Sequence, residues 1–373
     1  MIIIEHTLVW EGTDSNMTRH MFAGASSPVG FVDFFEHIMP LEKARKRYFL
    51  KGSSGSGKST FIKKTATVFE AEGYDIEKFH CANDPDSLDA ISVNSLGLCI
   101  IDATSPHSHD PEIPAAIDII IDFADFLDEG KIIGQIDEIK TLLRAKKTLA
   151  EKSRGYFSAL GNIYLAEKTA CEAALKMDCL NKEVQEYLNT LDVQNAQNQY
   201  GCNRKLFLSA LAPNGFVSFV DDFFNDCEVY GICSYEGIGA DIFLSKLRDE
   251  LNLRGTDTES FHCPFAPERL EYLHVPETKT AFVITGGRFG YKGNVDKKID
   301  INSCIDVKIQ SHAGSGIGKL YSDLFDKMLN DAVDSLKAAK DLHIRIEEIY
   351  AEAMDFEKVC EMTEKMIRGM LST

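Results

Sequence analysis

Short apolar runs and one amphipathic stretch alternate in the first hundred residues. Residues 47–50 and 98–101 are apolar runs that have the length of a strand. Between these runs, Phe61, Ile62 and Phe69 recur at a spacing that places them on one face of a helix. Because strands that alternate with amphipathic helices are typical of α/β proteins, the pattern predicts an α/β unit here.

Two long stretches further along the chain have a helical pattern. Residues 131–192 contain no proline and repeat apolar residues at helical spacing, and residues 316–371 behave in the same way. We expect each stretch to form a helical hairpin or a pair of helices. Each stretch would pack on its own α/β unit or on the other helical stretch.

The chain also repeats itself. Pro28 recurs as Pro213 at a shift of 185 residues, and the Phe-His-Cys at 79–81 recurs at 261–263 at a shift of 182. Because one register persists through such separate segments, the sequence predicts two copies of one α/β unit. The polar residues 194–199 have the composition of a linker between the copies.

A glycine-rich segment directly follows the first apolar run. Residues 52–59 read Gly-Ser-Ser-Gly-Ser-Gly-Lys-Ser and match the phosphate-binding pattern G-x-x-x-x-G-K-S/T in full. Glycines let several backbone amides converge on one phosphate, and the following helix directs its positive N-terminal end to the same place. The alternative is a flexible Gly/Ser linker, but strand, loop and helix are the setting that the pattern requires.

Each residue type in this segment has a role in phosphate binding. Lys58 would reach the β- and γ-phosphates of ATP, and the Ser59 hydroxyl would ligate Mg²⁺. Thr60 would touch the inner phosphates. The predicted nucleotide-binding residues are Gly52, Ser53, Ser54, Gly55, Ser56, Gly57, Lys58, Ser59 and Thr60.

A second acid is expected to hold Mg²⁺ from the end of a neighbouring buried strand. Asp102 directly follows the apolar run 98–101, so we predict it as the magnesium ligand beside Ser59 and, with Lys58, as a catalytic residue. The alternative is an aspartate that caps a turn. No glutamate follows Asp102, so the adjacent catalytic base of many motor-type ATPases is missing.

Two other segments offer catalytic candidates. Asp84, Asp86 and Asp89 follow a strand at the place where an α/β sheet usually opens its site, and one of them would orient water or bind a second substrate. A solvated turn with a helix cap is the alternative. His107 and Asp110 follow the magnesium strand, where a γ-phosphate sensor or a substrate clamp would lie, and the alternative is a plain loop. From these segments we name Asp84 and His107 as candidate catalytic residues.

The second copy has lost the phosphate-binding residues. At the shift of 182, Ala240 stands at the position of Lys58, and Asp241 stands at the position of Ser59. The lysine is absent and the aspartate would repel phosphate. We therefore expect no ordinary nucleotide binding in the second copy.

Composition narrows the partners. The chain has 373 residues and a formal net charge of −18, from 58 acidic and 40 basic residues. This surplus repels nucleic acid unless the bases gather on one face, so we expect no nucleic-acid partner. No stretch reaches 18 consecutive apolar residues and no leader begins the chain, which predicts no membrane span and no signal peptide. The ten scattered cysteines without a CxxC pair argue against zinc and a disulfide scaffold and indicate reduced thiols in a cytoplasm.

The whole arrangement resembles a poorly characterised bacterial family of tandem P-loop ATPases, which is frequent in spore-forming and related anaerobic Gram-positive bacteria. The resemblance covers essentially the full chain and implies the fold and ATP binding more than a biological role. Relatives of this kind are labelled only as ATPases or nucleotide-kinase-like proteins, and they tend to carry a usable loop in the second half too. The residues that carry the resemblance are 52–60, 80–81 with 84–89, 101–102, 106–107 and 110–111.

We therefore predict an α/β fold of tandem duplicated P-loop NTPase-type units with mostly parallel sheets, each followed by a helical appendage. The predicted parts are an active unit at 1–130, a helical appendage and linker at 131–200, a degenerate unit at 201–312 and a C-terminal helical appendage at 313–373.

The predicted function is Mg-ATP binding with slow or partner-stimulated hydrolysis at one site. One alternative is a small-molecule or nucleotide kinase, with an acceptor pocket formed by the acids of 84–89 and His107. The other alternative is a nucleotide-gated scaffold that binds ATP without turnover. The acceptor or protein partner stays unidentified in each case.

Overall fold

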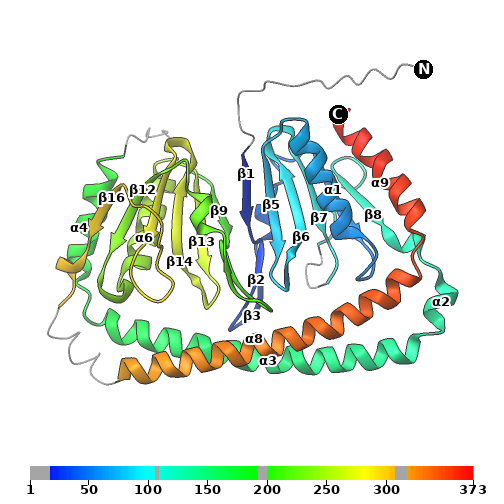
Figure 1. Ribbon diagram of the computed structural model, residues 1–373. Coiled ribbons are helices and arrows are strands. Elements are labelled where there is room, and N and C mark those ends of the chain that lie inside the picture. Colours follow the sequence, from blue (N-terminus) through cyan, green and yellow to red (C-terminus); the bar gives the residue numbers. More distant parts are fainter. Residues whose placement is uncertain (1–16, 106–108, 192–199, 307–316, 373) are drawn as a thin grey trace, which may run out of the picture.

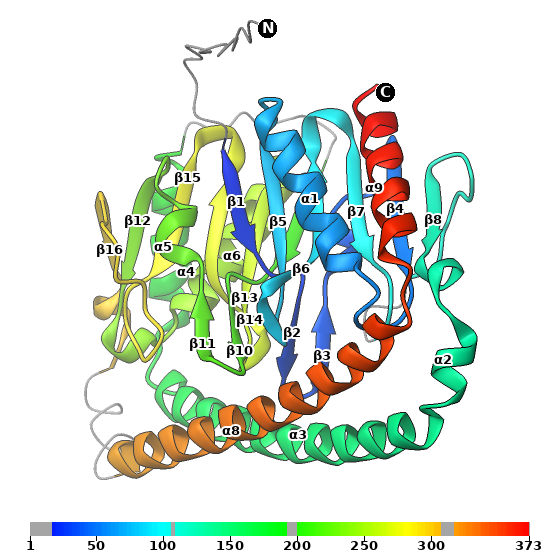
Figure 2. The same ribbon diagram turned by 45° about the vertical axis from the view of Figure 1, so that its right-hand side comes forward.

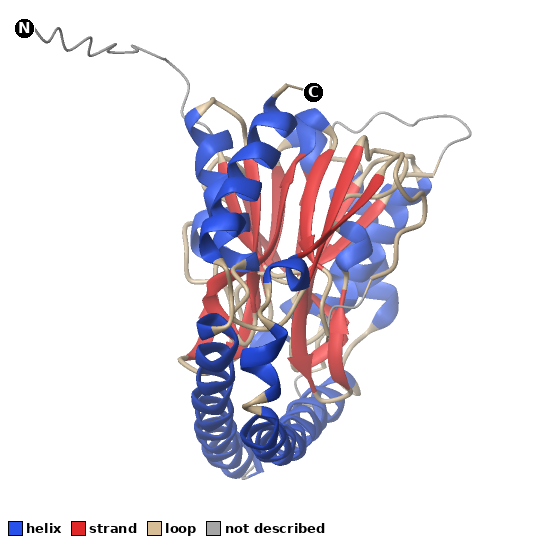
Figure 3. Ribbon diagram, turned by 90° about the vertical axis from the view of Figure 1, so that its right-hand side faces the viewer, coloured by secondary structure: helices blue, strands red, loops and turns tan. Residues whose placement is uncertain are grey.

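The computed structural model describes residues 17–105, 109–191, 200–306 and 317–372. Two six-stranded mixed sheets stand side by side, and two long helices run beneath both of them (Figure 1). The side view places these helices below the strands of both units (Figure 3). The predicted α/β class and the two similar units are confirmed.

The first sheet has the strand order β1-β5-β6-β7-β4-β8. The β1–β5, β4–β7 and β4–β8 pairs are parallel, whereas β6 is antiparallel to both of its neighbours. The elements of this unit are β1 (Thr18–Met21), β2 (Gly24–Ser27), β3 (Gly30–Asp33), η1 (Phe35–His37), β4 (Lys46–Lys51), α1 (Lys58–Ala71), β5 (Ile76–Cys81), β6 (Asp84–Val93), η2 (Asn94–Leu96), β7 (Leu98–Asp102), β8 (Asp118–Asp122) and η3 (Phe123–Phe126).

The second sheet repeats this order as β9-β13-β14-β15-β12-β16. From β12 to β15, each strand and the helix α6 begin 182 residues after their counterparts, and β9 begins 185 residues after β1, so both predicted shifts are confirmed. The elements are β9 (Asn203–Leu206), β10 (Ser209–Ala212), β11 (Gly215–Ser218), α5 (Val220–Phe223), β12 (Glu228–Cys233), η4 (Tyr235–Gly237), α6 (Ala240–Leu253), β13 (Thr258–Cys263), β14 (Ala266–Val275), η5 (Pro276–Thr278), β15 (Thr280–Ile284), β16 (Lys297–Asp300) and η6 (Asn302–Cys304).

The helical stretches form two long helices, each followed by a shorter one. The long helices α3 and α8 run antiparallel and are joined by side-chain hydrogen bonds, such as that from Ser153 Oγ to Ser335 Oγ at 3.0 Å (Figure 1). The helices are α2 (Glu129–Ile133), α3 (Ile136–Glu172), α4 (Met177–Leu188), α8 (Ile317–Glu352) and α9 (Phe356–Leu371).

The shorter helices pack on the opposite unit. Val359 and Met370 of α9 are buried in one core with Phe61 of α1, and Figure 2 shows the two helices side by side. In the same way, Val184 of α4 is buried in one core with Phe243 of α6. The expectation that a helical stretch packs only on its own unit or on the other stretch is therefore wrong for α4 and α9, although α3 and α8 do pack on each other.

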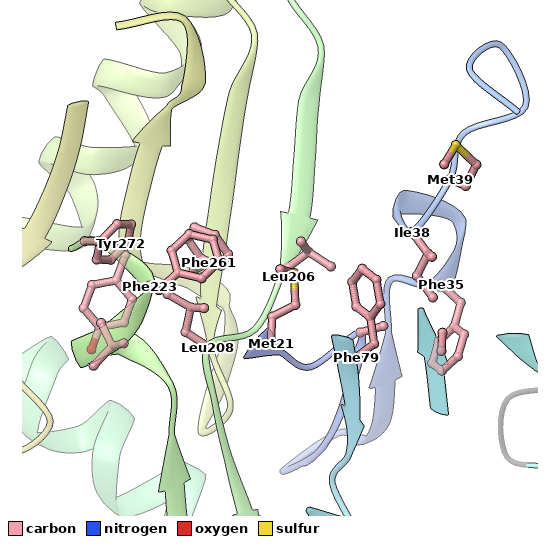
Figure 4. Packing of buried hydrophobic residues seen from close by; sticks show 14 of the residues in the cluster. Met21, Phe35, Ile38, Met39, Phe79, Leu206, Leu208, Phe223, Phe261 and Tyr272 are labelled. Atoms are coloured by element: carbon pink, nitrogen blue, oxygen red, sulfur yellow. The ribbon is translucent and has the colours of Figure 1, made fainter. Parts of the chain in front are cut away.

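Alternation along the strands gives each sheet two buried faces. Tyr48 and Leu50 face the core beneath α1 and α9, whereas Phe49 between them faces the other way. That second face belongs to a core shared by both units, in which Phe79 and Phe261 also lie (Figure 4). Burial on both faces explains why these strands read as continuous apolar runs.

The two units are joined by backbone and by charge. Phe22 and Phe207 exchange two backbone hydrogen bonds of 2.9 and 3.0 Å. Beside them, Arg204 donates to both oxygens of Glu77 at 2.8 and 2.7 Å, which is the geometry of a strong bidentate pair. The units are therefore held together by more than apolar contact.

A disulfide joins Cys179 of α4 to Cys304 of η6. The expectation that the cysteines are reduced thiols is wrong for this pair. In the described part of the chain, no helix is long and apolar enough to cross a membrane.

Candidate phosphate-binding site

The loop between β4 and α1 takes its shape from its glycines. Gly52, Gly55 and Gly57 have φ angles of 139°, 76° and 96°. L-amino acids with a side chain rarely adopt such angles, so glycine at these positions lets the loop curl around its own centre. Gly57 is the N-cap of α1 and lies in the left-handed region.

The start of α1 presents polar groups to this centre. The amides of Lys58, Ser59 and Thr60 lie in the first helical turn, where an α-helix offers them no intrahelical acceptor. Their aligned dipoles favour an anion at this end of the helix. Thr60 is exposed, and Ser59 is partly buried with its Oγ accepting a 3.2 Å hydrogen bond from the Leu88 amide.

Lys58 lies inside the loop. Its Nζ donates to the carbonyl oxygens of Gly52 at 3.0 Å and Ser53 at 2.7 Å. Burial lowers the pKa of Lys58, and the charge of Asp102, whose Oδ2 lies 3.8 Å from Nζ, opposes that effect. The lysine that sequence reasoning selected is thus a buried cation held by loop carbonyls.

Asp102 reaches the site because β7 lies next to β4. Leu50, near the end of β4, pairs with Asp102 at the end of β7. The Asp102 Oδ1 also accepts a 3.0 Å hydrogen bond from the Thr104 amide, so the turn contact of the alternative interpretation is present as well. The structure therefore places Asp102 both beside Lys58 and at the start of a turn.

The residues of the loop fit a phosphate with Mg²⁺. The Ser56 Oγ is buried and has no hydrogen-bond partner among the residues that the structure describes. A buried hydroxyl in that state favours a ligand that supplies the partner. Ser59 and Asp102 supply a hydroxyl and a carboxylate oxygen, which are the hard ligands that Mg²⁺ takes together with phosphate oxygens.

The acids at 84–89 lie on a strand. They begin β6, so the alternative of a turn with a helix cap is wrong. Asp84 accepts a 2.7 Å hydrogen bond from Lys340 of α8 and a 2.6 Å hydrogen bond from Ser87, and Asp86 is exposed. Asp84 thus holds α8 in place and is already engaged by a cation.

Asp89 is the acid that the strands bring to the site. Ala90 of β6 pairs with Ile101 of β7, which puts Asp89 beside Asp102 on the neighbouring strand. Burial, followed by the Asp102 charge, raises the pKa of Asp89 to about 7. The signal in the sequence is a hairpin pattern, because Asp89 precedes one apolar run and Asp102 ends the next. Sequence reasoning considered Asp89 but named Asp84 instead.

The segment after Asp102 is described from residue 109 onwards. His107 lies outside the described residues, so the structure does not place it. His109 stacks on Phe35 with ring centroids 5.3 Å apart, and its carbonyl oxygen accepts a 3.2 Å hydrogen bond from Lys51. This segment therefore returns to the end of β4.

Helix α8 covers the loop, which sequence reasoning missed. A β-carbon built on Gly55 would lie 2.3 Å from the carbonyl oxygen of Glu347. On the same side, Lys146 of α3 donates a 2.8 Å hydrogen bond to His343. Burial and then the Lys146 charge lower the pKa of His343 to about 4. Both long helices therefore place polar groups near the loop.

The loop of the second unit has a similar backbone but is filled with ion pairs. Gly239 caps α6 with a φ of 72°. Arg269 donates to Asp241 at 2.8 Å and to Glu172 of α3, and Lys168 of α3 donates to the carbonyl oxygen of Gly237 at 3.2 Å. Side chains of the protein itself thus neutralise Asp241.

Comparisons of this chain with models of protein families, with curated proteins and with solved structures give no match. Evidence about the function therefore comes from the residues and the geometry of the chain itself.

Proposed function

We propose that this protein binds Mg-ATP at residues 52–60 of the first unit and hydrolyses it there. The observation that carries the proposal is Lys58, a buried cation whose Nζ lies on two loop carbonyl oxygens at the start of α1. A bound phosphate would replace these neutral acceptors by charged ones, which form stronger hydrogen bonds.

The residues of the site have separate tasks in this proposal. The loop amides hold the β-phosphate, and Lys58 neutralises charge that develops on the transferring phosphate. Ser59 and Asp102 would hold Mg²⁺, which supplies further neutralisation of the phosphate oxygens when it is bound. Most of the catalysis is therefore positioning and electrostatics.

Asp89 is the proposed general base. A carboxyl with a pKa of about 7 is matched to proton transfer at neutral pH. The water oxygen attacks the γ-phosphorus while the Asp89 carboxylate accepts a proton from that water. The bond from the γ-phosphorus to the β–γ bridging oxygen breaks, and ADP leaves with the electron pair.

The test is ATP consumption by the purified protein with magnesium, compared with Lys58→Ala, Asp102→Ala and the control Lys63→Ala. Lys63 is an exposed lysine on the same helix, outside the phosphate-binding pattern. We expect both site variants to abolish turnover and the control to keep it. Turnover that survives Lys58→Ala would overturn the proposal.

The contact between Gly55 and Glu347 favours a second candidate, a nucleotide-gated scaffold. In this alternative ATP binding changes the position of α8, and no turnover is needed. Tight ATP binding that Lys58→Ala removes, combined with no consumption by the wild type, would favour the scaffold. Phosphate release at a rate that exceeds the Asp102→Ala rate would favour the hydrolase.

A further inference from the structure

A cavity of about 190 Å³ lies between α1 and α9, beside the phosphate-binding loop. Figure 2 shows the two helices next to each other. The lining residues that bear on its use are Gly57, Thr60 and Phe61 at the start of α1, with Phe356, Val359 and Cys360 of α9.

The cavity begins where the phosphate-binding residues end. Gly57 caps α1, and Thr60 completes its first turn. A β-carbon on Gly57 would lie 3.6 Å from both Phe356 and Val359, so the absent side chain leaves the way from the loop to the cavity open. A ligand whose phosphates lie on the loop could place its other end here.

The size and chemistry of the cavity suit one flat ring system. Sites that enclose a whole small molecule measure roughly 300–1,000 Å³, so this smaller cavity fits one part of a ligand. The Phe356 side chain is 43% exposed, which leaves aromatic surface available. Nucleobases stack on aromatic side chains, whatever their sequence of ring nitrogens, because every base has a π-face.

The degenerate unit fills the corresponding place. A β-carbon on Gly239 would lie 2.8 Å from the Leu175 Cδ1, so the Leu175 side chain covers the helix cap there. Gly239 stands at the position of Gly57, and Ala240 stands at the position of Lys58. The unit that keeps the lysine is thus the unit that keeps an opening beside its helix cap.

We propose that the base of the bound nucleoside triphosphate lies in this cavity and stacks on Phe356. The inference rests on the proposed function, since the phosphates of the same ligand occupy the loop. Phe356 begins α9, which follows the second unit in the chain. A bound nucleotide would therefore touch both halves of the protein, with its phosphates on α1 and its base on α9.

Calorimetry with two ligands separates the base from the phosphates. The full-length protein is titrated in magnesium with ATP and with inorganic tripolyphosphate, which has no base. We expect Phe356→Ala to weaken ATP binding by about 10-fold or more and to leave tripolyphosphate binding unchanged. Lys58→Ala should weaken both ligands. Tyr200→Ala, which removes a 77% exposed aromatic residue elsewhere, is the matched control.

Alkylation of Cys360 gives a second measurement without a substitution. Cys360 lines the cavity and is an exposed free thiol, and Cys202 is an exposed free thiol outside the lining. Saturating ATP should slow iodoacetamide modification of Cys360 but not of Cys202, and tripolyphosphate should slow neither. Mass spectrometry of the two peptides reads out both rates in one sample.

The outcomes separate the two proposals. If Phe356→Ala binds ATP as tightly as the wild type and ATP does not protect Cys360, the base site is overturned. In that case, loss of both ligands in Lys58→Ala would leave the proposed function standing. A wild type that binds neither ATP nor tripolyphosphate would overturn both proposals.

Discussion

The backbone of Glu347 lies directly on Gly55, so the phosphate-binding loop of the first unit touches the long helix that follows the second unit. Gly55 has a φ of 76°, and a β-carbon there would stand 2.3 Å from the Glu347 carbonyl oxygen. A rearrangement of the loop on ligand binding must therefore move α8 or be resisted by it.

Gly55→Ala tests this contact. The added methyl group meets backbone atoms of α8, which cannot rotate away as a side chain could, and the positive φ adds strain. We expect a loss of about 1–3 kcal/mol in the free energy of unfolding, together with weaker ATP binding. Urea denaturation and calorimetry provide the two readouts.

Gly155→Ala is the control for that substitution. Gly155 lies within α3, and among the described residues no atom outside its own helix backbone and neighbours comes within 4 Å of a β-carbon built there. Alanine at this place should keep the stability or raise it by up to about 1 kcal/mol through helix propensity. Equal losses in both variants would contradict the role assigned to the loop contact.

Asp89→Asn tests the general base. Because the pKa of Asp89 is raised from its usual 3.8 to about 7, its carboxylate forms only as the pH rises through that value. We expect kcat/KM for ATP to increase with pH up to about 7 and then level off. Asp89→Asn should lower kcat by about 10²-fold or more while ATP still binds, and the rising limb should vanish. A variant that keeps the wild-type pH profile would rule Asp89 out.

Glu77→Gln tests the charge pairs between the units. Burial raises the pKa of Glu77, but the Arg204 and Arg19 guanidiniums outweigh burial and lower it from its usual 4.5 to about 2. The charged form therefore stabilises the fold fully above pH 4.5, and this stabilisation is lost as the pH falls from 4.5 towards 2. Loss of the charge should cost about 3–5 kcal/mol at pH 7, measured by urea denaturation.

The same substitution should flatten the pH dependence of stability below pH 4.5, since Gln does not titrate. Glu186→Gln removes one partner of the exposed Lys182–Glu186 pair and should change stability by less than about 0.5 kcal/mol. If the two variants are equally stable at pH 7, the pairs between the units do not hold them together.

Reduction tests the link between Cys179 and Cys304. A cross-link between residues 125 positions apart restricts the unfolded chain, so we expect reductant to lower the unfolding free energy by about 2–4 kcal/mol. Cys179→Ser should show the same loss and no further response to reductant, whereas Cys202→Ser, at an exposed free thiol, should behave as the wild type. A wild-type denaturation midpoint that ignores reductant would contradict the disulfide.

Local pattern was sufficient for much of the first unit. The helix after the loop was predicted from the spacing of Phe61, Ile62 and Phe69, and all three are buried in α1. Periodicity works here because the helix buries one stripe against its own sheet. The two copies were also visible, because repeated residues at a constant shift need no knowledge of contacts.

The neighbours of each element were decided only by the tertiary structure. The sequence shows that α4 and α9 are amphipathic, but burial of apolar surface has no direction and does not name its partner. Both sheets offer a similar apolar helix face, and the lengths of α3 and α8 carry α4 and α9 to the opposite unit (Figure 1). For the same reason, Phe356 beside Gly57 could not be read from the chain.

The site divides along the same line. The sequence by itself determined the loop glycines, Lys58 and the candidate ligands Ser59 and Asp102, because a short contiguous motif and the end of a strand specify them. Only the tertiary structure selected Asp89 over Asp84, since strand pairing puts Asp89 beside Asp102 while α8 brings Lys340 to Asp84. Contacts between residues far apart in sequence depend on how whole elements pack, and no local pattern records that packing.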